Sequence, residues 1–134
     1  MKFEEFTNII SNLSNAKVGG LNAQFKLAPK LRKNYSEDKI ANSNPRKAAV
    51  LALFYPDKDK NTRFLLTLRA SYSGTHSSQI SFPGGKIELQ DNSMKETALR
   101  ETYEEVGVKP NTITTFKEMT DVYIPPSNFL VRPF

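Results

Sequence analysis

Residues 82–108 read FPGGKIELQDNSMKETALRETYEEVGV, and the second half of this stretch carries the signals of a helix with defined ends. Ser93 is a residue type that caps helix N-termini, and Glu96 follows it by three residues. The two side chains are therefore expected to form a capping box. Gly107 supplies the C-terminal stop. The sequence thus predicts a helix over residues 93–106.

The predicted helix has two different faces. Side chains that recur at three- and four-residue spacing predict the inward face. They are Ala98, Leu99, Thr102 and Val106. Glu101, Glu104 and Glu105 share another stripe, where like charges repel by roughly 0.2–0.5 kcal/mol per pair. Either this stripe is a solvated acidic face, or a hard divalent cation such as Mg²⁺ compensates for the repulsion.

The residues before the helix help to decide between a solvated acidic face and a site for a divalent cation. The Gly84-Gly85 pair follows the strand-like residues 79–82, and residues 86–92 form a loop that leads into the helix. In this context the stretch resembles the Nudix box, G-x5-E-x7-R-E-U-x-E-E-x-G-U, where U is a bulky apolar residue. The matching residues are Gly85, Arg100, Glu101, Glu104, Glu105, Gly107 and Val108. Two residues depart from the pattern. Asp91 lies one residue further from Arg100 than the pattern requires, and Thr102 takes the first U position.

Both departures are similar to those of one branch of the Nudix family, the coenzyme A diphosphatases, whose boxes tend to read FPGG…D…TALRE. Residues 65–69, LLTLR, also resemble the start of the signature that precedes the box in that branch, roughly LLTxRS-x3-R-x3-G-x3-FPGG. The spacing is preserved, but Ala70, Gly74 and Ser78 replace the serine, the arginine and the glycine of that signature.

The resemblance implies an α/β fold, a Nudix-type α/β/α sandwich around a mixed β-sheet, and a hydrolase that uses Mg²⁺ or Mn²⁺ to cleave a diphosphate. It implies coenzyme A as the favoured small-molecule substrate, cut to 4'-phosphopantetheine and 3',5'-ADP. Glu101 and Glu105 would bind the metal, and Glu104 would be a further ligand or a base acting through water. Arg100 would orient these carboxylates through charge-assisted hydrogen bonds.

The resemblance also implies a set of substrate-binding residues. They are Arg69, His76, Gly84, Gly85 and Lys86. A turn at Gly84-Gly85 would let the backbone come close to the metal and its ligands. His76 is the only histidine of the chain, and it either contacts phosphate or is simply a loop residue.

Two other functions stay open on the sequence. A hydrolase of another dinucleotide, such as ADP-ribose or a diadenosine polyphosphate, would share all the chemistry of the box. A binding module built on an inactive Nudix fold is the alternative that is not an enzyme. A panel of substrates distinguishes the first. The three intact glutamates argue against the second, whereas the early stop at Phe134 argues for it.

Composition limits the class of protein. The chain has 134 residues, which suits one domain, and 38% of them are hydrophobic without a run long enough for a membrane span. It has no cysteine, and Lys2, Glu4 and Glu5 interrupt any N-terminal signal sequence, so a cytoplasmic location is expected.

The charge is uneven along the chain. Residues 1–60 carry 11 Lys/Arg and 6 Asp/Glu, whereas residues 61–134 carry 8 of each. This basic half would attract a phosphorylated nucleotide, although general solubility or weak affinity for nucleic acid explains it equally well. Nucleic acid is not the expected partner.

The remaining elements follow from periodicity. Residues 2–13 are expected to form a helix with an apolar stripe of Phe3, Phe6, Ile10 and Leu13, which is more consistent with core packing than with a cofactor site. Residues 14–45 are expected to be an irregular lead-in. Residues 47–55 and 63–69 are expected to pair as a β-hairpin that is buried on both faces.

Further strands are expected at residues 112–116, at 118–124 and from residue 129 onward. The whole chain is then one domain, with the lead-in at residues 1–45 and the sheet and its helix at residues 46–134. A sheet ending at Phe134 would be C-terminally incomplete, so either the chain is a fragment or something else covers the exposed face. Self-association through the C-terminal face, as in a homodimer, or a monomer of marginal stability is expected.

Overall fold

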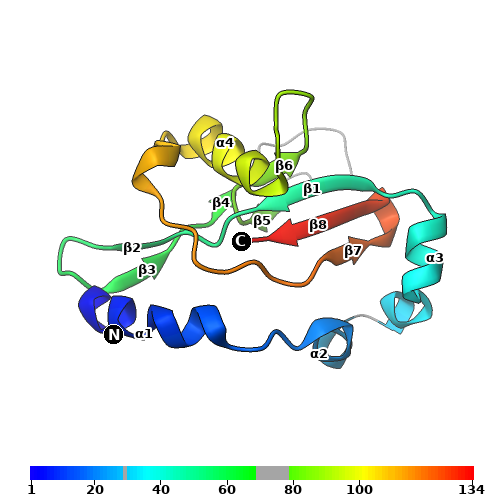
Figure 1. Cartoon of the computed structure of the whole chain (residues 1–134), viewed down its shortest axis with the longest axis horizontal. Coiled ribbons are helices and arrows are strands. Elements are labelled where there is room, and N and C mark those ends of the chain that lie inside the picture. Colours follow the sequence, from blue (N-terminus) through cyan, green and yellow to red (C-terminus); the bar gives the residue numbers. More distant parts are fainter. Residues whose placement is uncertain (29, 69–78) are drawn as a thin grey trace.

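A four-stranded mixed sheet forms the centre of the molecule in a computed structural model that describes residues 1–28, 30–68 and 79–134 (Figure 1). The strand order is β6-β1-β8-β7. Their bounds are Gly84–Lys86 for β6, Arg46–Val50 for β1, Phe129–Pro133 for β8 and Val122–Ile124 for β7. β1 runs parallel to β8 and antiparallel to β6, and β7 is antiparallel to β8. The predicted α/β fold with a mixed sheet is confirmed.

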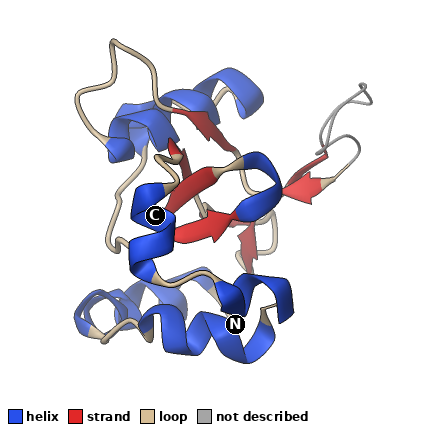
Figure 2. Ribbon diagram, turned by 90° about the vertical axis from the view of Figure 1, so that its right-hand side faces the viewer, coloured by secondary structure: helices blue, strands red, loops and turns tan. Residues whose placement is uncertain are grey.

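Helices lie on both sides of these strands. Helix α4, Met94–Val106, packs against β1 and β6. Helices α1, Phe3–Asn15, and α2, Gly20–Leu27, lie on the opposite side in both ribbon views (Figures 1 and 2). Helix α3, Glu37–Asn42, stands at the end of the sheet near β7 and β8 (Figure 1). The arrangement has the layers of the expected sandwich.

The lead-in before the sheet is more regular than predicted. Helix α2, the 3₁₀ turn η1 at Lys30–Asn34 and helix α3 occupy much of residues 14–45, so the prediction of an irregular segment is wrong. Ser36 accepts a hydrogen bond from the backbone N–H of Lys39 and so caps α3. These helices are short, and the segment is rich in Asn, Ser and Gly, which have low helix propensity. Its composition therefore does not predict the helices.

The predicted hairpin forms only in part. Strand β2, Phe54–Pro56, pairs with β3, Thr62–Phe64, but the residues before β2 belong to β1 in the central sheet. Strand β4, Thr67–Leu68, pairs with β5, Ile80–Ser81, in a second small sheet.

Burial of residues 63–69 on both faces is wrong for the described part of that run. Phe64, Leu66 and Leu68 are 53%, 47% and 72% exposed. The reason is that β3 and β4 lie in two-stranded sheets outside the central sheet that α4 covers.

The core lies between the central sheet and α4. Ala49 of β1 and Leu51, which directly follows β1, pack against Ala98 of α4, and all three are buried. Partly buried side chains extend this cluster. They are Leu53, Met94, Leu99, Ile113 and Phe134.

The segment after α4 has less strand than predicted. Residues 110–112 form the 3₁₀ turn η2, Pro110–Thr112, and residues 113–121 contain no strand. Only Val122–Ile124 of the expected strand 118–124 is β-structure, followed by the 3₁₀ turn η3, Pro125–Ser127. Strand β8 confirms the predicted strand from residue 129.

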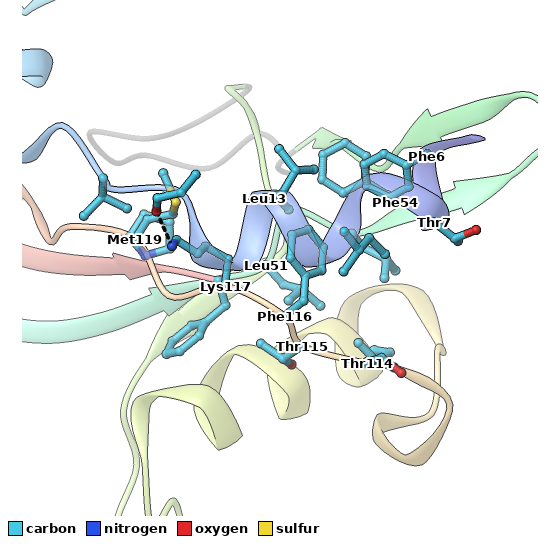
Figure 3. A pocket seen from close by; sticks show the side chains of 18 of the residues that line it. Phe6, Thr7, Leu13, Leu51, Phe54, Thr114, Thr115, Phe116, Lys117 and Met119 are labelled. Atoms are coloured by element: carbon cyan, nitrogen blue, oxygen red, sulfur yellow. Dashed lines mark hydrogen bonds between the residues drawn. The ribbon is translucent and has the colours of Figure 1, made fainter. Parts of the chain in front are cut away.

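An apolar pocket of about 810 Å³ lies between α1, residues 51–54 after β1 and residues 112–119 (Figure 3). The predicted stripe of α1 lines it, with Phe6 buried and Leu13 39% exposed. Lys117 Nζ crosses to the end of α1 and donates to Ser14 O at 2.6 Å and to Ala16 O. A cation at a helix C-terminus stabilises the last carbonyls, so Lys117 fixes α1 against this segment.

None of the helices in the described ranges has the length and hydrophobicity needed to cross a membrane.

Candidate active site

The ends of α4 are set by the residues that the sequence singles out. Ser93 Oγ accepts a hydrogen bond from Glu96 N at 3.2 Å, and Gly107 ends the helix in the left-handed region with φ of 75°. The reciprocal half of the capping box differs from the prediction. The Glu96 carboxylate accepts from the backbone N–H of Asn92 at 2.8 Å instead of from Ser93. The cap still satisfies an N-terminal donor, and α4 begins where the sequence predicts.

Asp91 and Arg100 form a bidentate ion pair at the start of the site. Arg100 Nε donates to Asp91 Oδ1 and Nη2 donates to Oδ2, both at 2.9 Å. The Asp91 side chain is 3% exposed and also accepts from Glu88 N at 2.9 Å and from Thr97 Oγ1 at 3.0 Å. The hydrogen bonds of Arg100 hold the pKa of the Asp91 carboxyl well below its usual value.

The other side of the Arg100 guanidinium faces the predicted metal ligands. Nη1 donates to Glu101 Oε1 at 3.1 Å and to Glu104 Oε2 at 3.2 Å. Nη2 also donates to the backbone carbonyl of Lys86 at 3.1 Å, which joins α4 to β6. With the two bonds to Asp91, these contacts use all five N–H donors of the guanidinium. The side chain to which the family resemblance gives the role of orienting carboxylates therefore lies between Asp91 on one side and Glu101 and Glu104 on the other.

Glu101 and Glu105 lie along β6. A Cβ added to Gly85 would overlap the carboxylate of Glu101, so only glycine leaves room for Glu101 in its present position. The backbone N–H of Gly84 lies 3.4 Å from Glu105 Oε1. Gly84 and Gly85 are strand residues paired with Val50 and Ala49 rather than a turn, so the predicted turn is wrong. The close approach of backbone and carboxylate that the turn would provide occurs in the strand.

Burial is the largest influence on the Glu101 carboxyl. It raises the pKa of Glu101 above the usual value, and the hydrogen bond and charge of Arg100 oppose this shift. The Glu104 side chain is 54% exposed, so it meets solvent as well as Arg100. The stripe thus contains one largely buried carboxylate, Glu101, and one exposed carboxylate, Glu104, which accept hydrogen bonds from the same nitrogen, Nη1 of Arg100.

The carboxylates beside Gly85 offer ligands of the kind that a divalent cation takes. The donors are carboxylate oxygens, the class that Mg²⁺ prefers, and the absence of a Cβ at Gly85 lets the Glu101 carboxylate lie against β6. Within the described ranges, no three His, Cys, Asp or Glu side chains gather closely enough to enclose an ion. Arg100 engages two of the three glutamates. The residues fit a cation that one or two carboxylates and substrate phosphates hold together, rather than a closed protein site.

The remaining predicted substrate-binding residues divide into two groups. Lys86 is exposed at the end of β6, next to the site. Arg69 and His76 lie outside the described residues. Thr97, fully buried on α4, contacts Asp91 and was not singled out from the sequence. The signal that identifies it is its place between the acidic residue and the arginine, one helical turn before Arg100.

Sequence relatives cover the same region. The chain is 44% identical over 69 residues to Nudix hydrolase 22, a chloroplastic protein of Arabidopsis thaliana, covering 52% of this chain and 23% of the relative. It is 33% identical over 93 residues to a peroxisomal coenzyme A diphosphatase of Caenorhabditis elegans, covering 63% of this chain and 40% of the relative. The matched part is thus well under half of either relative's length.

Solved structures share the fold. A MutT/nudix family protein from Enterococcus faecalis superposes with a TM-score of 0.52 at 18% identity, covering 80% of this chain and 48% of that chain. The sequence model of the NUDIX domain matches residues 45–133, about two thirds of the chain, and this range contains all four strands of the central sheet. The chain belongs to the Nudix domain family.

Proposed function

We propose that the chain acts as a metal-dependent hydrolase of nucleoside diphosphates linked to a second group, with coenzyme A as the favoured substrate. The observation that carries this proposal is the position of Arg100, which Asp91 holds in place and which in turn contacts Glu101 and Glu104 beside Gly85. Three carboxylates on one helical stripe next to a glycine strand are suited to a polyphosphate substrate that arrives with a hard cation.

Each residue has a role in this proposal. Glu101 and Glu105 supply carboxylate oxygens beside β6, and Glu104 is a further ligand or the base that takes a proton from the attacking water. Arg100 keeps Glu101 and Glu104 in position. Lys86 and the backbone of Gly84 and Gly85 line the approach of the diphosphate.

When bound, Mg²⁺ or Mn²⁺ would neutralise negative charge on the diphosphate and make the attacking water more acidic. The oxygen of one water molecule adds to a phosphorus atom, and the phosphoanhydride bond breaks. For coenzyme A the products are 3',5'-ADP and 4'-phosphopantetheine.

The preference for coenzyme A has two supports. Residues 65–69 and 82–85 resemble the signature of the coenzyme A diphosphatases, and the nematode relative is named as such an enzyme. Arg69 and His76 are proposed to contact the substrate. Hydrolysis of ADP-ribose or a diadenosine polyphosphate is the second candidate activity, because the plant relative is named only as a Nudix hydrolase.

A substrate panel tests this proposal. The chain is incubated with coenzyme A, ADP-ribose and diadenosine tetraphosphate, with Mg²⁺ and with EDTA, and products are separated by chromatography. We expect 3',5'-ADP from coenzyme A in Mg²⁺ and no product in EDTA. Faster cleavage of another dinucleotide would reassign the substrate. No cleavage of any of them in Mg²⁺ or Mn²⁺ would favour a binding module instead.

The proposal includes a homodimer. The pocket beside α1 is lined largely by apolar side chains, and Leu13, Val18 and Met119 in this lining are 39–46% exposed. Burying this surface against a second copy of the chain would remove apolar area from water. The cytoplasmic location expected from the sequence stays a prediction.

A further inference from the structure

Two buried threonines on α4 make different contacts. Thr97 and Thr102 are both fully buried, and each hydroxyl lies near the carbonyl oxygen four residues earlier. Thr102 Oγ1 donates to Ala98 O at 2.7 Å, which is the usual contact of a threonine inside a helix. Thr97 Oγ1 lies 3.3 Å from Ser93 O but only 3.0 Å from Asp91 Oδ2. Thr97 alone of the two has an acceptor outside its own helix.

The single proton of the Thr97 hydroxyl belongs with the carboxylate. A hydroxyl donates one hydrogen bond, and an ionised acceptor forms a shorter and stronger bond than a neutral carbonyl. The carboxylate of Asp91 is almost completely buried, so each lost donor leaves charge without compensation. Thr97 thus helps to fix the orientation of the Asp91 side chain.

Asp91 in turn fixes Arg100. Its two oxygens bind Nε and Nη2 of the guanidinium, which leaves Nη1 directed at Glu101 and Glu104. A bidentate pair determines the plane of the guanidinium as well as its distance. A rotation of Asp91 would therefore turn Arg100 and move the donor that the two glutamates share.

We infer that Thr97 is a positioning residue for the carboxylates of the site, acting through Asp91 and Arg100. The inference rests on the proposed function, because it assigns Thr97 to the same site. Groups that orient metal-binding side chains from outside typically change metal affinity or activity by about 10- to 100-fold when they are removed. A merely structural threonine would change stability without changing either quantity.

The test compares Thr97→Val with Thr102→Val in the full chain. Both substitutions remove a buried hydroxyl from α4 and keep the shape of the side chain, but only the first removes a bond to Asp91. Free Mn²⁺ is measured by electron paramagnetic resonance, and kcat for coenzyme A is measured at saturating Mg²⁺. We expect Thr97→Val to weaken Mn²⁺ binding or lower kcat at least about tenfold, and Thr102→Val to change both by less than about threefold.

A second pair keeps the test decisive if Thr97→Val does not fold. Thr97→Ser and Thr97→Ala both lose the methyl group and differ only in the hydroxyl. We expect Thr97→Ser to stay within about threefold of the parent chain and Thr97→Ala to behave as Thr97→Val. Equal Mn²⁺ affinity and equal kcat in the serine and alanine variants would overturn the inference.

The outcomes also separate this inference from the proposed function. If the parent chain binds Mn²⁺ but hydrolyses none of the substrates, the proposed activity fails and the Mn²⁺ titrations of the variants still decide the role of Thr97. If the parent chain neither binds Mn²⁺ nor hydrolyses a substrate, both are overturned. If the parent is active and Thr97→Val matches Thr102→Val, the inference alone fails.

Discussion

At the scale of single residues, the ion pair between Asp91 and Arg100 links the loop before α4 to the acidic stripe on the helix. Both carboxylate oxygens of Asp91 and all the N–H donors of the Arg100 guanidinium have a hydrogen-bond partner within 3.2 Å. A bidentate pair with this degree of satisfaction recovers much of the cost of taking two charges out of water. Removing one partner should therefore lower the free energy of unfolding substantially.

Asp91→Asn tests this pair through pH. The pKa of Asp91 is lowered in the folded chain, so its contribution to stability is present above its unfolded pKa of about 3.9 and is lost as the pH falls toward the folded value. We expect the substitution to lower the free energy of unfolding by about 3 kcal/mol at pH 7. The difference from the parent should shrink below about pH 4, as measured by urea denaturation at pH 7 and pH 3.

Asp59→Asn is the control, because Asp59 is exposed at the tip of the β2–β3 hairpin. It should change stability by less than about 0.5 kcal/mol at either pH. A pH-independent loss in Asp91→Asn would mean that the side chain contributes through packing and not through its charge.

Sequence reasoning at this scale works best where the partner is close along the chain. Ser93, Gly107 and the three glutamates are found from spacing within one helix, and their places on α4 agree with that spacing. Thr97 is missed because its partner, Asp91, lies before the helix in a loop whose course the sequence does not define. The close approach of Gly85 to Glu101 is expected from the sequence, but the strand that provides it is not, since that depends on β6 pairing with β1 and packing against α4.

At the scale of elements, α1 shows what periodicity can and cannot predict. The three- and four-residue spacing of its apolar side chains identifies the helix within two residues of its observed bounds. The spacing does not predict that these side chains line a partly open pocket, because the opposite wall of the pocket comes from residues 112–119, far away in sequence. Residues 112–116 in that wall have a strand-like composition but pair with no strand in the described structure.

Phe6→Ala measures how firmly α1 is attached. The Phe6 ring is 7% exposed and its centroid lies 4.8 Å from that of Phe54 and 6.3 Å from that of Phe116. We expect a loss of about 3 kcal/mol in the free energy of unfolding, at the lower end for a core phenylalanine because a pocket already adjoins the site. Urea denaturation gives the value.

Ile9→Ala on the outer side of the same helix is the matched control, since Ile9 is 37% exposed. It should cost less than about 1 kcal/mol. Similar losses in the two variants would contradict the packing of α1 through its Phe6 face.

At the scale of the whole molecule, the sequence predicts the layers better than the connections. The mixed sheet and the helix over it follow from residues 82–108 and their resemblance to a known family. The parallel pairing of β1 with β8 joins residues about 80 positions apart, and local patterns carry no information on such a pairing. The first strand of the predicted hairpin is divided between β1 and β2, and local sequence patterns do not predict this division either.

The proposed homodimer predicts a concentration-dependent mass. Met119→Glu places a charge at the border of the apolar pocket, where Met119 is 46% exposed. We expect sedimentation at micromolar concentration to show dimers of the parent chain and monomers of this variant, because burying an unpaired charge opposes association. Leu89→Glu, at a fully exposed leucine outside the pocket lining, should leave the dimer intact. A parent chain that sediments as a monodisperse monomer and melts cooperatively would contradict the dimer.

The central claim is that the carboxylates of α4 give the chain its metal-dependent activity, and the most direct measurement is the turnover of Glu101→Gln and Glu105→Gln at limiting Mg²⁺. Each substitution removes a ligand charge while keeping the size of the side chain. We expect release of 3',5'-ADP from coenzyme A to fall by about two orders of magnitude or more, with the fold intact by circular dichroism. Glu4→Gln on α1 should match the parent chain. Turnover close to that of the parent in either α4 variant would contradict the account.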